Sequence, residues 1–184
     1  MGSFYTSHTL RGPSQAAVVA ELNGRSAYVS ASEHGCVTVL DEACESQDGE
    51  ELASLAARLS AVFQCPVLAV LNHDDDILYF ELYEAGEQRD EYNSSPSYFD
   101  DTVEDDGPSG GNPALLAAAF GVTDKERIEA ALRSTEYVFA TERHHELALA
   151  LSLPSFSVGI GYTYASAGEL PPGVPKDVFT HTDG

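Results

Sequence analysis

The sequence predicts an α+β fold: a ferredoxin-like βαββαβ unit whose antiparallel sheet is extended by a β-meander, plus C-terminal helices packing on the sheet. Three observations predict it. Residues 3–71 follow the order strand, helix, strand, strand, helix, strand. Residues 77–92 then hold two more strand patterns, and after residue 113 apolar residues return at helical spacing.

Composition divides the chain into three parts. Residues 1–93 form the predicted ferredoxin-like core, residues 94–112 an acidic loop rich in Ser, Pro and Gly, and residues 113–184 a helical extension with an irregular tail. With 184 residues, 43% of them apolar, the chain can bury one ordinary core. We therefore expect the three parts to pack as one compact unit.

The first half of the core is a strand, a helix and a hairpin. Residues 3–10 alternate with the period of a half-buried strand. A Gly-Pro-Ser sequence at residues 12–14 ends this strand and starts a helix that runs to about Leu22. Residues 25–32 and 36–40 then have the alternation and the β-branched content of two hairpin strands.

The second half of the core begins with the most clearly predicted helix. Asp48, with Glu51 three residues later, has the spacing of a capping box. The following apolar residues repeat at helical spacing: Leu52, Leu55, Ala56, Leu59, Val62 and Phe63. Residues 66–71 are a nearly continuous apolar run, which predicts a central strand.

Residues 77–84 and 88–92 extend the sheet to six predicted strands. One face of the first of them carries Leu78, Phe80 and Leu82, and the other carries Ile77, Tyr79, Glu81 and Tyr83. Both faces therefore need cover, and two helices on one side cannot supply it. We expect the helices after residue 113 to pack on the second face. The charged residues 88–92 are typical of a protected sheet edge.

The C-terminal third is predicted from helix caps. Asn112 before a proline predicts a helix start, and Gly121 predicts its end. Thr123 with Glu126 has the spacing of another capping box. A third helix is predicted at residues 142–151, ended by a proline at position 154.

Two stretches of this third are less regular. The pattern of residues 137–140 suits a strand as well as a helix, so both remain open. Three prolines among residues 171–175 forbid long regular structure, and we expect the end of the chain to be loosely held.

The net charge of the chain limits the kinds of partner that it is expected to bind. The chain has 30 acidic and nine basic residues, a formal net charge of -21. Such a surface repels nucleic-acid phosphates and anionic lipid headgroups, and it attracts basic proteins. Residues 93–111 contain no basic residue at all. Inside this loop Tyr98 and Phe99 are aromatic, and we expect the pair to be pinned on the core.

The three cysteines, Cys36, Cys44 and Cys65, are odd in number and lack C-x-x-C spacing. Neither a disulfide framework nor a zinc site is predicted, and we expect buried, reduced thiols. No apolar run has the length of a signal peptide or a spanning helix, so the expected location is the cytoplasm.

The acidic sequence at residues 73–76 is the first candidate metal site. Asn72, Asp74 and Asp76 match the first half of a calcium loop, but Ile77 stands where glycine is required. Asp and Asn are also what a tight turn between strands favours, and the turn is the preferred interpretation. The alternative is a divalent metal held by His73, Asp74 and Asp76.

Glu142 and His145 are the second candidate, at the i, i+3 spacing of di-iron bundles, with His144 between them. Only one copy of the motif is present, and it is not H-E-x-x-H. A solvated helix face is therefore the preferred interpretation. No cofactor is predicted.

Two segments carry a resemblance: LNHDDDILYFELYEAGEQRDEYNSSPSYF and ERHHELALALSLPSFSVGIGYTY. Both resemble segments of uncharacterised bacterial proteins of similar length. The resemblance implies a bacterial cytosolic origin and carries over no activity and no site residues.

The leading functional hypothesis is a non-enzymatic, acidic protein-binding module that meets a basic partner, as immunity and antitoxin proteins do. Its candidate binding residues are Tyr98, Phe99, Asp100, Asp101 and Asp105. The rival is a small-molecule- or metal-binding enzyme with a cleft between the sheet and the C-terminal helices. Its candidate residues are His73, Asp74, Asp76, His144 and His145. A homodimer without further chemistry is the third possibility.

Overall fold

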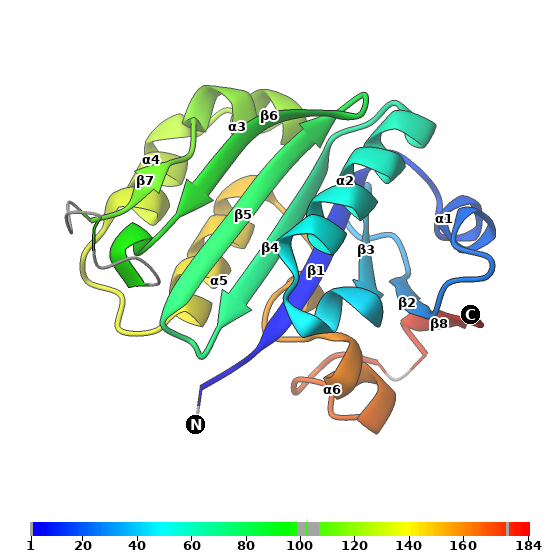
Figure 1. Cartoon of the computed structure of the whole chain (residues 1–184). Helices are drawn as coiled ribbons and strands as arrows, with labels where there is room; N and C mark the ends of the chain where they lie inside the picture. Colours follow the sequence, from blue (N-terminus) through cyan, green and yellow to red (C-terminus); the bar gives the residue numbers. More distant parts are fainter. Residues whose placement is uncertain (1, 99–101, 103–106, 176) are drawn as a thin grey trace.

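The computed structural model describes residues 2–98, 102, 107–175 and 177–184. These residues form an α+β fold around one open, antiparallel, eight-stranded sheet (Figure 1). The strand order is β7-β6-β5-β4-β1-β3-β2-β8. The strands are β1 (Tyr5–Arg11), β2 (Ala27–Ser30), β3 (Cys36–Asp41), β4 (Val67–His73), β5 (Ile77–Glu84), β6 (Glu87–Asn93), β7 (Ser109–Gly110) and β8 (Phe179–Thr182).

Within the described residues six α-helices and three 3-10 turns connect these strands. The α-helices are α1 (Gln15–Glu21), α2 (Gly49–Phe63), α3 (Pro113–Phe120), α4 (Lys125–Arg133), α5 (Ala140–Leu151) and α6 (Tyr162–Ala167). The 3-10 turns are η1 (Ala43–Ser46), η2 (Pro96–Tyr98) and η3 (Ser155–Ser157).

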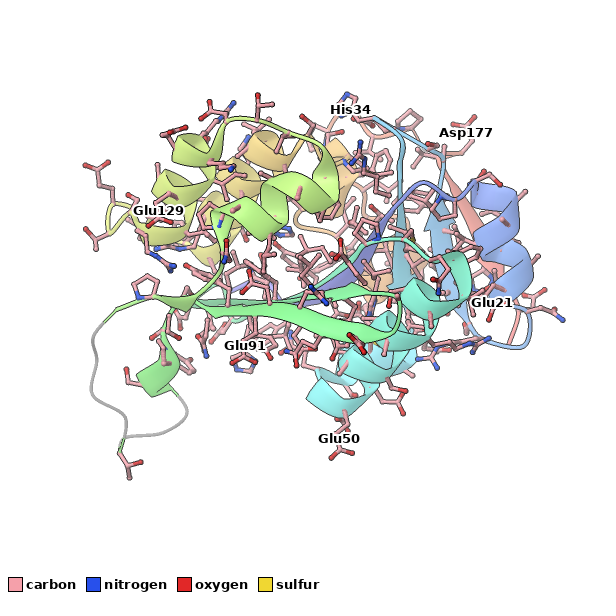
Figure 2. The ribbon with its side chains drawn as sticks, turned by 90° about the horizontal axis from the view of Figure 1, so that it is seen from above. Glu21, His34, Glu50, Glu91, Glu129 and Asp177 are labelled. Atoms are coloured by element: carbon pink, nitrogen blue, oxygen red, sulfur yellow. The ribbon has the colours of Figure 1, made fainter. Side chains whose placement is uncertain are left out.

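The sheet lies between two helical layers, as Figure 2 shows from above. On one face α1 and α2 bury apolar side chains of β1 to β4. On the other face α3, α4 and α5 cover Leu68, Phe80 and Tyr92. The expectation that the C-terminal helices cover the second face is confirmed. A smaller cluster around Leu40 and Phe156 closes that face over β2 and β3.

The predicted caps define the start of α2 and both ends of α3. Asp48 accepts the N–H of Glu50 at 2.8 Å at the start of α2. Asn112 accepts the N–H groups of the first turn of α3, and Gly121 ends α3 with a positive φ of 70°. The cap predicted at Thr123 is wrong by one residue, because Asp124 accepts the N–H of Arg127 instead.

Three expectations about the sheet and the tail are corrected. The sheet has eight strands rather than six, because β7 and β8 add to its two ends. The end of the chain is not loosely held, since β8 pairs with β2 from Ala27↔Thr182 to Ser30↔Phe179. Residues 137–139 form neither strand nor helix, and α5 begins at Ala140.

All three cysteines are buried and free. Burial raises the pKa of Cys36 and of Cys65 to about 11, and it raises that of Cys44 further. Thiols in this state are poor nucleophiles at neutral pH. In the part of the chain that the structure describes, no helix combines the length and the apolar character needed to cross a membrane.

Candidate partner-binding surface

The acidic sequence between β4 and β5 forms a tight hairpin turn of three residues, since His73 pairs with Ile77. Asp74 and Asp75 have positive φ angles of 50° and 62°, and the N–H of Asp76 donates to the carbonyl of His73 at 3.0 Å. Consecutive left-handed residues are what the right-handed twist of a tight hairpin requires, and Asp tolerates them. This geometry supports the turn interpretation of the acidic sequence.

Asp75 also caps α5, which lies 65 residues or more further along the chain. Its carbonyl accepts the N–H of Ala140 at 2.7 Å, and its Oδ1 accepts the N–H of Thr141 at 2.8 Å. The Thr141 hydroxyl donates to the same oxygen. Phe139, the residue at the N-cap position, makes no side-chain cap of its own. Asp75 thus satisfies the first two N–H groups of the helix, one with its backbone carbonyl and one with its carboxylate.

The other two aspartates contact the N-terminal segment and the 3-10 turn η2. Asp74 Oδ1 accepts the N–H of Gly2 at 3.0 Å, and Asp76 Oδ2 accepts the Tyr98 hydroxyl at 3.3 Å. The His73 ring packs edge-on against Phe4 and Tyr98, with centroid distances of 5.0 and 6.1 Å. We call Phe4, His73, Asp74, Asp76 and Tyr98 the turn surface.

Tyr98 therefore lies on the turn surface and not in the core, and the expectation that it is pinned on the core is corrected. Its side chain is 43% exposed, and that of Phe4 is 40% exposed. The short turn η2 follows β6, and the end of β6 lies beside β5. Tyr98 is therefore placed next to Asp76. The other binding candidates, Phe99, Asp100, Asp101 and Asp105, lie outside the described residues.

His144 is a buried structural side chain. Its Nδ1 lies 2.7 Å from the Tyr5 hydroxyl, and Asn72 Nδ2 donates to that hydroxyl at 3.4 Å. Burial, helped by the neighbouring His145, lowers the pKa of His144 to about 3, so the ring is neutral at pH 7. Its Nε2 has no hydrogen-bond partner among the described residues. His144 joins β1 to α5 and is closed to solvent.

The structure does not assemble the candidate metal ligands. His73 lies 2.6 Å from Gln47 Oε1, whereas His144 contacts Tyr5. Across residues 2–98, 102, 107–175 and 177–184, no three His, Cys, Asp or Glu side chains are grouped so that they could hold a metal ion. The constellation that the enzyme hypothesis needs is therefore not formed by these residues.

His145 instead lines a cleft beside α5, with a volume of about 540 Å³. The residues around it are Glu136, Tyr137, Thr141, Glu142, His145, Glu146 and Val158. Of the five candidate metal ligands only His145 reaches this cleft. Thr141, on its wall, is hydrogen-bonded to the half-buried Asp75 and to the buried Asn72.

A cluster that sequence analysis did not single out lies on the α2 face of β5 and β6. Glu81 and Glu91 are directly opposite each other in the strand register, and Tyr79 and Tyr83 flank Glu81 on the same face. The Tyr79 hydroxyl donates to Glu81 Oε1 at 2.6 Å. The sequence feature that could have revealed this cluster is a carboxylate on the inward face of a strand, with aromatic residues as its neighbours on that face.

The described residues thus define an α+β protein with acidic and aromatic side chains gathered on the β5–β6 half of its sheet. Comparison of the chain with protein-family models, with curated proteins and with solved structures gives no match.

Proposed function

We propose that this chain is a non-enzymatic, acidic binding protein for a basic protein partner. The observation that carries the proposal is the set of contacts that its few arginine side chains make. Five arginines pair with seven carboxylates: Arg25 with Asp41 and Glu51, Arg58 with Glu21, Arg89 with Glu84 and Glu87, Arg127 with Glu146, and Arg133 with Glu129. Most of the acidic residues that the structure describes therefore have no arginine within ion-pairing distance.

Two further arginines are turned to backbone carbonyls. Arg143 donates to the carbonyls of Ala131, Leu132 and Ser134, and Arg11 donates to that of Ala119. Arg143 thereby links α5 to α4, and Arg11 links β1 to α3. The net negative field outside the protein speeds encounter with a positively charged surface and weakens with salt.

The turn surface is the part of the molecule at which we propose that the basic partner binds. It combines the exposed rings of Phe4 and Tyr98 with the carboxylates of Asp74 and Asp76. Aromatic rings beside carboxylates suit lysine and arginine side chains, which pair with the charge and stack on the ring. Asp100, Asp101 and Asp105, which follow Tyr98 closely in the sequence, stay candidate binding residues, and they lie outside the described residues.

The fold proposal is that residues 1–93 are a ferredoxin-like unit. It is supported by the strand order β4-β1-β3-β2 and by the position of α1 and α2 in one buried cluster. Immunity and antitoxin proteins combine small α+β folds with acidic surfaces, so the comparison with them is one of fold and charge. We place the protein in the bacterial cytoplasm as part of the same proposal.

The test is capture of a partner at low salt, followed by binding measurements on the purified pair. We expect a basic protein to be recovered from a lysate of the source organism at 50 mM NaCl. Its affinity should fall about tenfold or more by 300 mM NaCl, because exposed charges are screened within about 8 Å at physiological ionic strength. Tyr98→Ala combined with Asp76→Asn should weaken it, and Glu129→Gln on the opposite layer should not. Recovery of no partner, or of one indifferent to salt, would contradict the proposal.

The alternative function is a small-molecule enzyme that uses the cleft beside α5. The cleft is large enough for a metabolite, and His145 and Thr141 offer polar groups on its wall. This alternative predicts that a small-molecule library contains ligands that raise the melting temperature, and that His145→Ala removes the effect. If no compound raised the melting temperature, the binding-protein function would be the better supported of the two.

A further inference from the structure

Exposed apolar side chains gather at one place on the surface. Two of those that the structure describes, Val62 and Leu149, stand apart near the C-terminal ends of α2 and α5. The others lie around the β4–β5 turn, and we call them the apolar patch: Phe4, Tyr98, Val138 and Phe139. Single exposed apolar residues are ordinary, whereas a cluster of them marks an interaction surface.

Phe4 and Tyr98 are connected through the turn surface. Both rings pack against the ring of His73 between them. The Tyr98 hydroxyl also donates to Asp76. This half of the apolar patch therefore belongs to the surface already proposed for the basic partner.

Val138 and Phe139 adjoin the same turn from the side of α5. Together with Asp76 they line a cavity of about 150 Å³. The N–H of the next residue, Ala140, donates to the carbonyl of Asp75 at 2.7 Å. Figure 1 shows this yellow segment running beside the β4–β5 turn into α5. The two halves of the apolar patch thus meet at one acidic turn.

The backbone of Val138 and Phe139 is held in place although their side chains are exposed by 77% and 52%. They belong to neither a helix nor a strand. Glu142 Oε2 accepts the N–H groups of both residues, at 3.0 and 3.1 Å. A contact surface that is fixed in advance loses less conformational entropy when a partner binds.

The charge around the apolar patch decides what can cover it. The carboxylates of Asp74 and Asp76 belong to the turn, and Asp76 is exposed. Arg143, which also lines the cavity, is only 7% exposed and donates to backbone carbonyls. A second copy of the chain would bring another net charge of -21, which repels the first. A segment with Lys or Arg beside apolar residues complements both features.

We propose that the basic partner binds through a segment in which apolar residues alternate with Lys or Arg. Its apolar side chains pack on Val138 and Phe139, and its cations pair with Asp74 and Asp76. This inference rests on the proposed function and names the chemistry that the partner must present. Apolar contacts at the centre of an interface supply much of its affinity, whereas charges at the rim mainly speed encounter.

The test compares two peptides of equal charge, acetyl-KLKFKLK-amide and acetyl-KGKSKGK-amide, in nuclear magnetic resonance titrations of the ¹⁵N-labelled full chain. We expect the first peptide to shift the amide signals of Asp76, Val138 and Phe139 in a saturable way. The second peptide lacks the apolar side chains and should bind about tenfold more weakly.

Variants of exposed residues locate the contact. Val138→Ser and Phe139→Ser should each weaken binding of the first peptide about fivefold. The matched controls Val62→Ser and Leu149→Ser remove apolar side chains outside the apolar patch and should leave its affinity unchanged. All four side chains are between 48% and 77% exposed, so the variants are expected to fold.

Each other outcome has a defined meaning. Equal binding of both peptides, unchanged in Val138→Ser and Phe139→Ser, would overturn the apolar contact and leave the proposed function as a general attraction to basic proteins. Equal binding of the acidic analogue acetyl-ELEFELE-amide would instead overturn the proposed function and leave an apolar docking surface.

Two further results would also overturn this inference. A dimer in light scattering that Phe139→Ser dissociates would show that a second copy covers the apolar patch. Binding of none of the peptides would remove the proposed segment, and capture of a partner at low salt would then test the proposed function by itself.

Discussion

Asp75 shows how one side chain can serve both a turn and a distant helix. Its left-handed backbone closes the β4–β5 hairpin, and its Oδ1 accepts the N–H of Thr141 at 2.8 Å. We expect Asp75→Ala to lower the free energy of unfolding by about 1–3 kcal/mol, because a cap and a buried hydrogen bond are lost together.

The control for this prediction is Asp74→Ala. Asp74 has a similar φ of 50° but accepts only the N–H of Gly2 near the chain end. It therefore carries the same conformational penalty without the cap. Urea unfolding of both variants measures the difference, and equal losses of stability would show that Asp75 does not cap α5.

His144 makes stability depend on pH. Its pKa is lowered to about 3 in the folded chain, by burial first and by His145 second, whereas an unfolded histidine has a pKa near 6.5. Between these values the unfolded chain binds a proton that the folded chain does not. The contribution of His144 is therefore fully present above pH 6.5 and is lost as the pH falls from 6.5 towards 3.

The expected size of this effect is about 2 kcal/mol between pH 7 and pH 5, at about 1.4 kcal/mol per unit below 6.5. Urea unfolding at the two pH values measures it. His144→Gln cannot titrate, so its loss of stability over the same interval should be smaller by about that amount. An identical pH dependence in the variant would show that His144 is not held neutral.

At the scale of elements, α4 and α5 are joined by one buried arginine. The Arg143 guanidinium donates to the carbonyls of Ala131, Leu132 and Ser134 at 2.7–2.9 Å and lies 4.9 Å from the centroid of the Tyr137 ring. It therefore satisfies the C-terminal carbonyls of α4 from the side of α5, where a positive charge also favours the helix dipole.

We expect Arg143→Met to destabilise the protein by about 2–4 kcal/mol, because buried carbonyls lose charged donors while the apolar stem is kept. Arg127→Met is the matched control. Arg127 forms a solvated ion pair with Glu146 at 3.7 Å, and such a pair contributes about 0–1 kcal/mol. Thermal unfolding compares them, and similar losses in both would contradict the bridging role of Arg143.

Local patterns predicted the long elements and missed the short ones. The helical spacing of apolar residues in α2 and the two-residue alternation in β5 are both visible within one continuous segment, so both elements were predicted. β7 has two residues and β8 has four, and each exists because a neighbouring strand offers unpaired backbone groups. That information lies in the partner strand and not in the segment itself.

The candidate sites also include one feature that local sequence predicted and others that it did not. The β4–β5 turn was predicted because Asp and Asn favour left-handed backbone locally. The position of Tyr98 was not, because it depends on where β6 ends relative to β5. The opposition of Glu81 and Glu91 requires the register of two strands, including the irregularity between Leu82 and Tyr83. A one-residue slip would place one of these side chains on the other face.

At the scale of the whole molecule, the net charge of -21 opposes the folded state. Compact negative charge repels itself, and salt screens that repulsion. We expect the melting temperature to rise by several degrees between 20 and 300 mM NaCl, as differential scanning fluorimetry would measure. A melting temperature that fell or stayed constant would show that internal ion pairs outweigh the repulsion between surface carboxylates.

The pairing of β8 with β2 has a consequence for synthesis on the ribosome. The N–H of Ala27 donates to the Thr182 hydroxyl, 155 residues further along the chain, so the outer edge of β2 stays open until residue 182 has emerged. Contacts of such long sequence separation form slowly, and an open strand edge can meanwhile pair with another nascent chain. Until β8 pairs with β2, two copies emerging from neighbouring ribosomes are therefore exposed to pairing with each other along this edge.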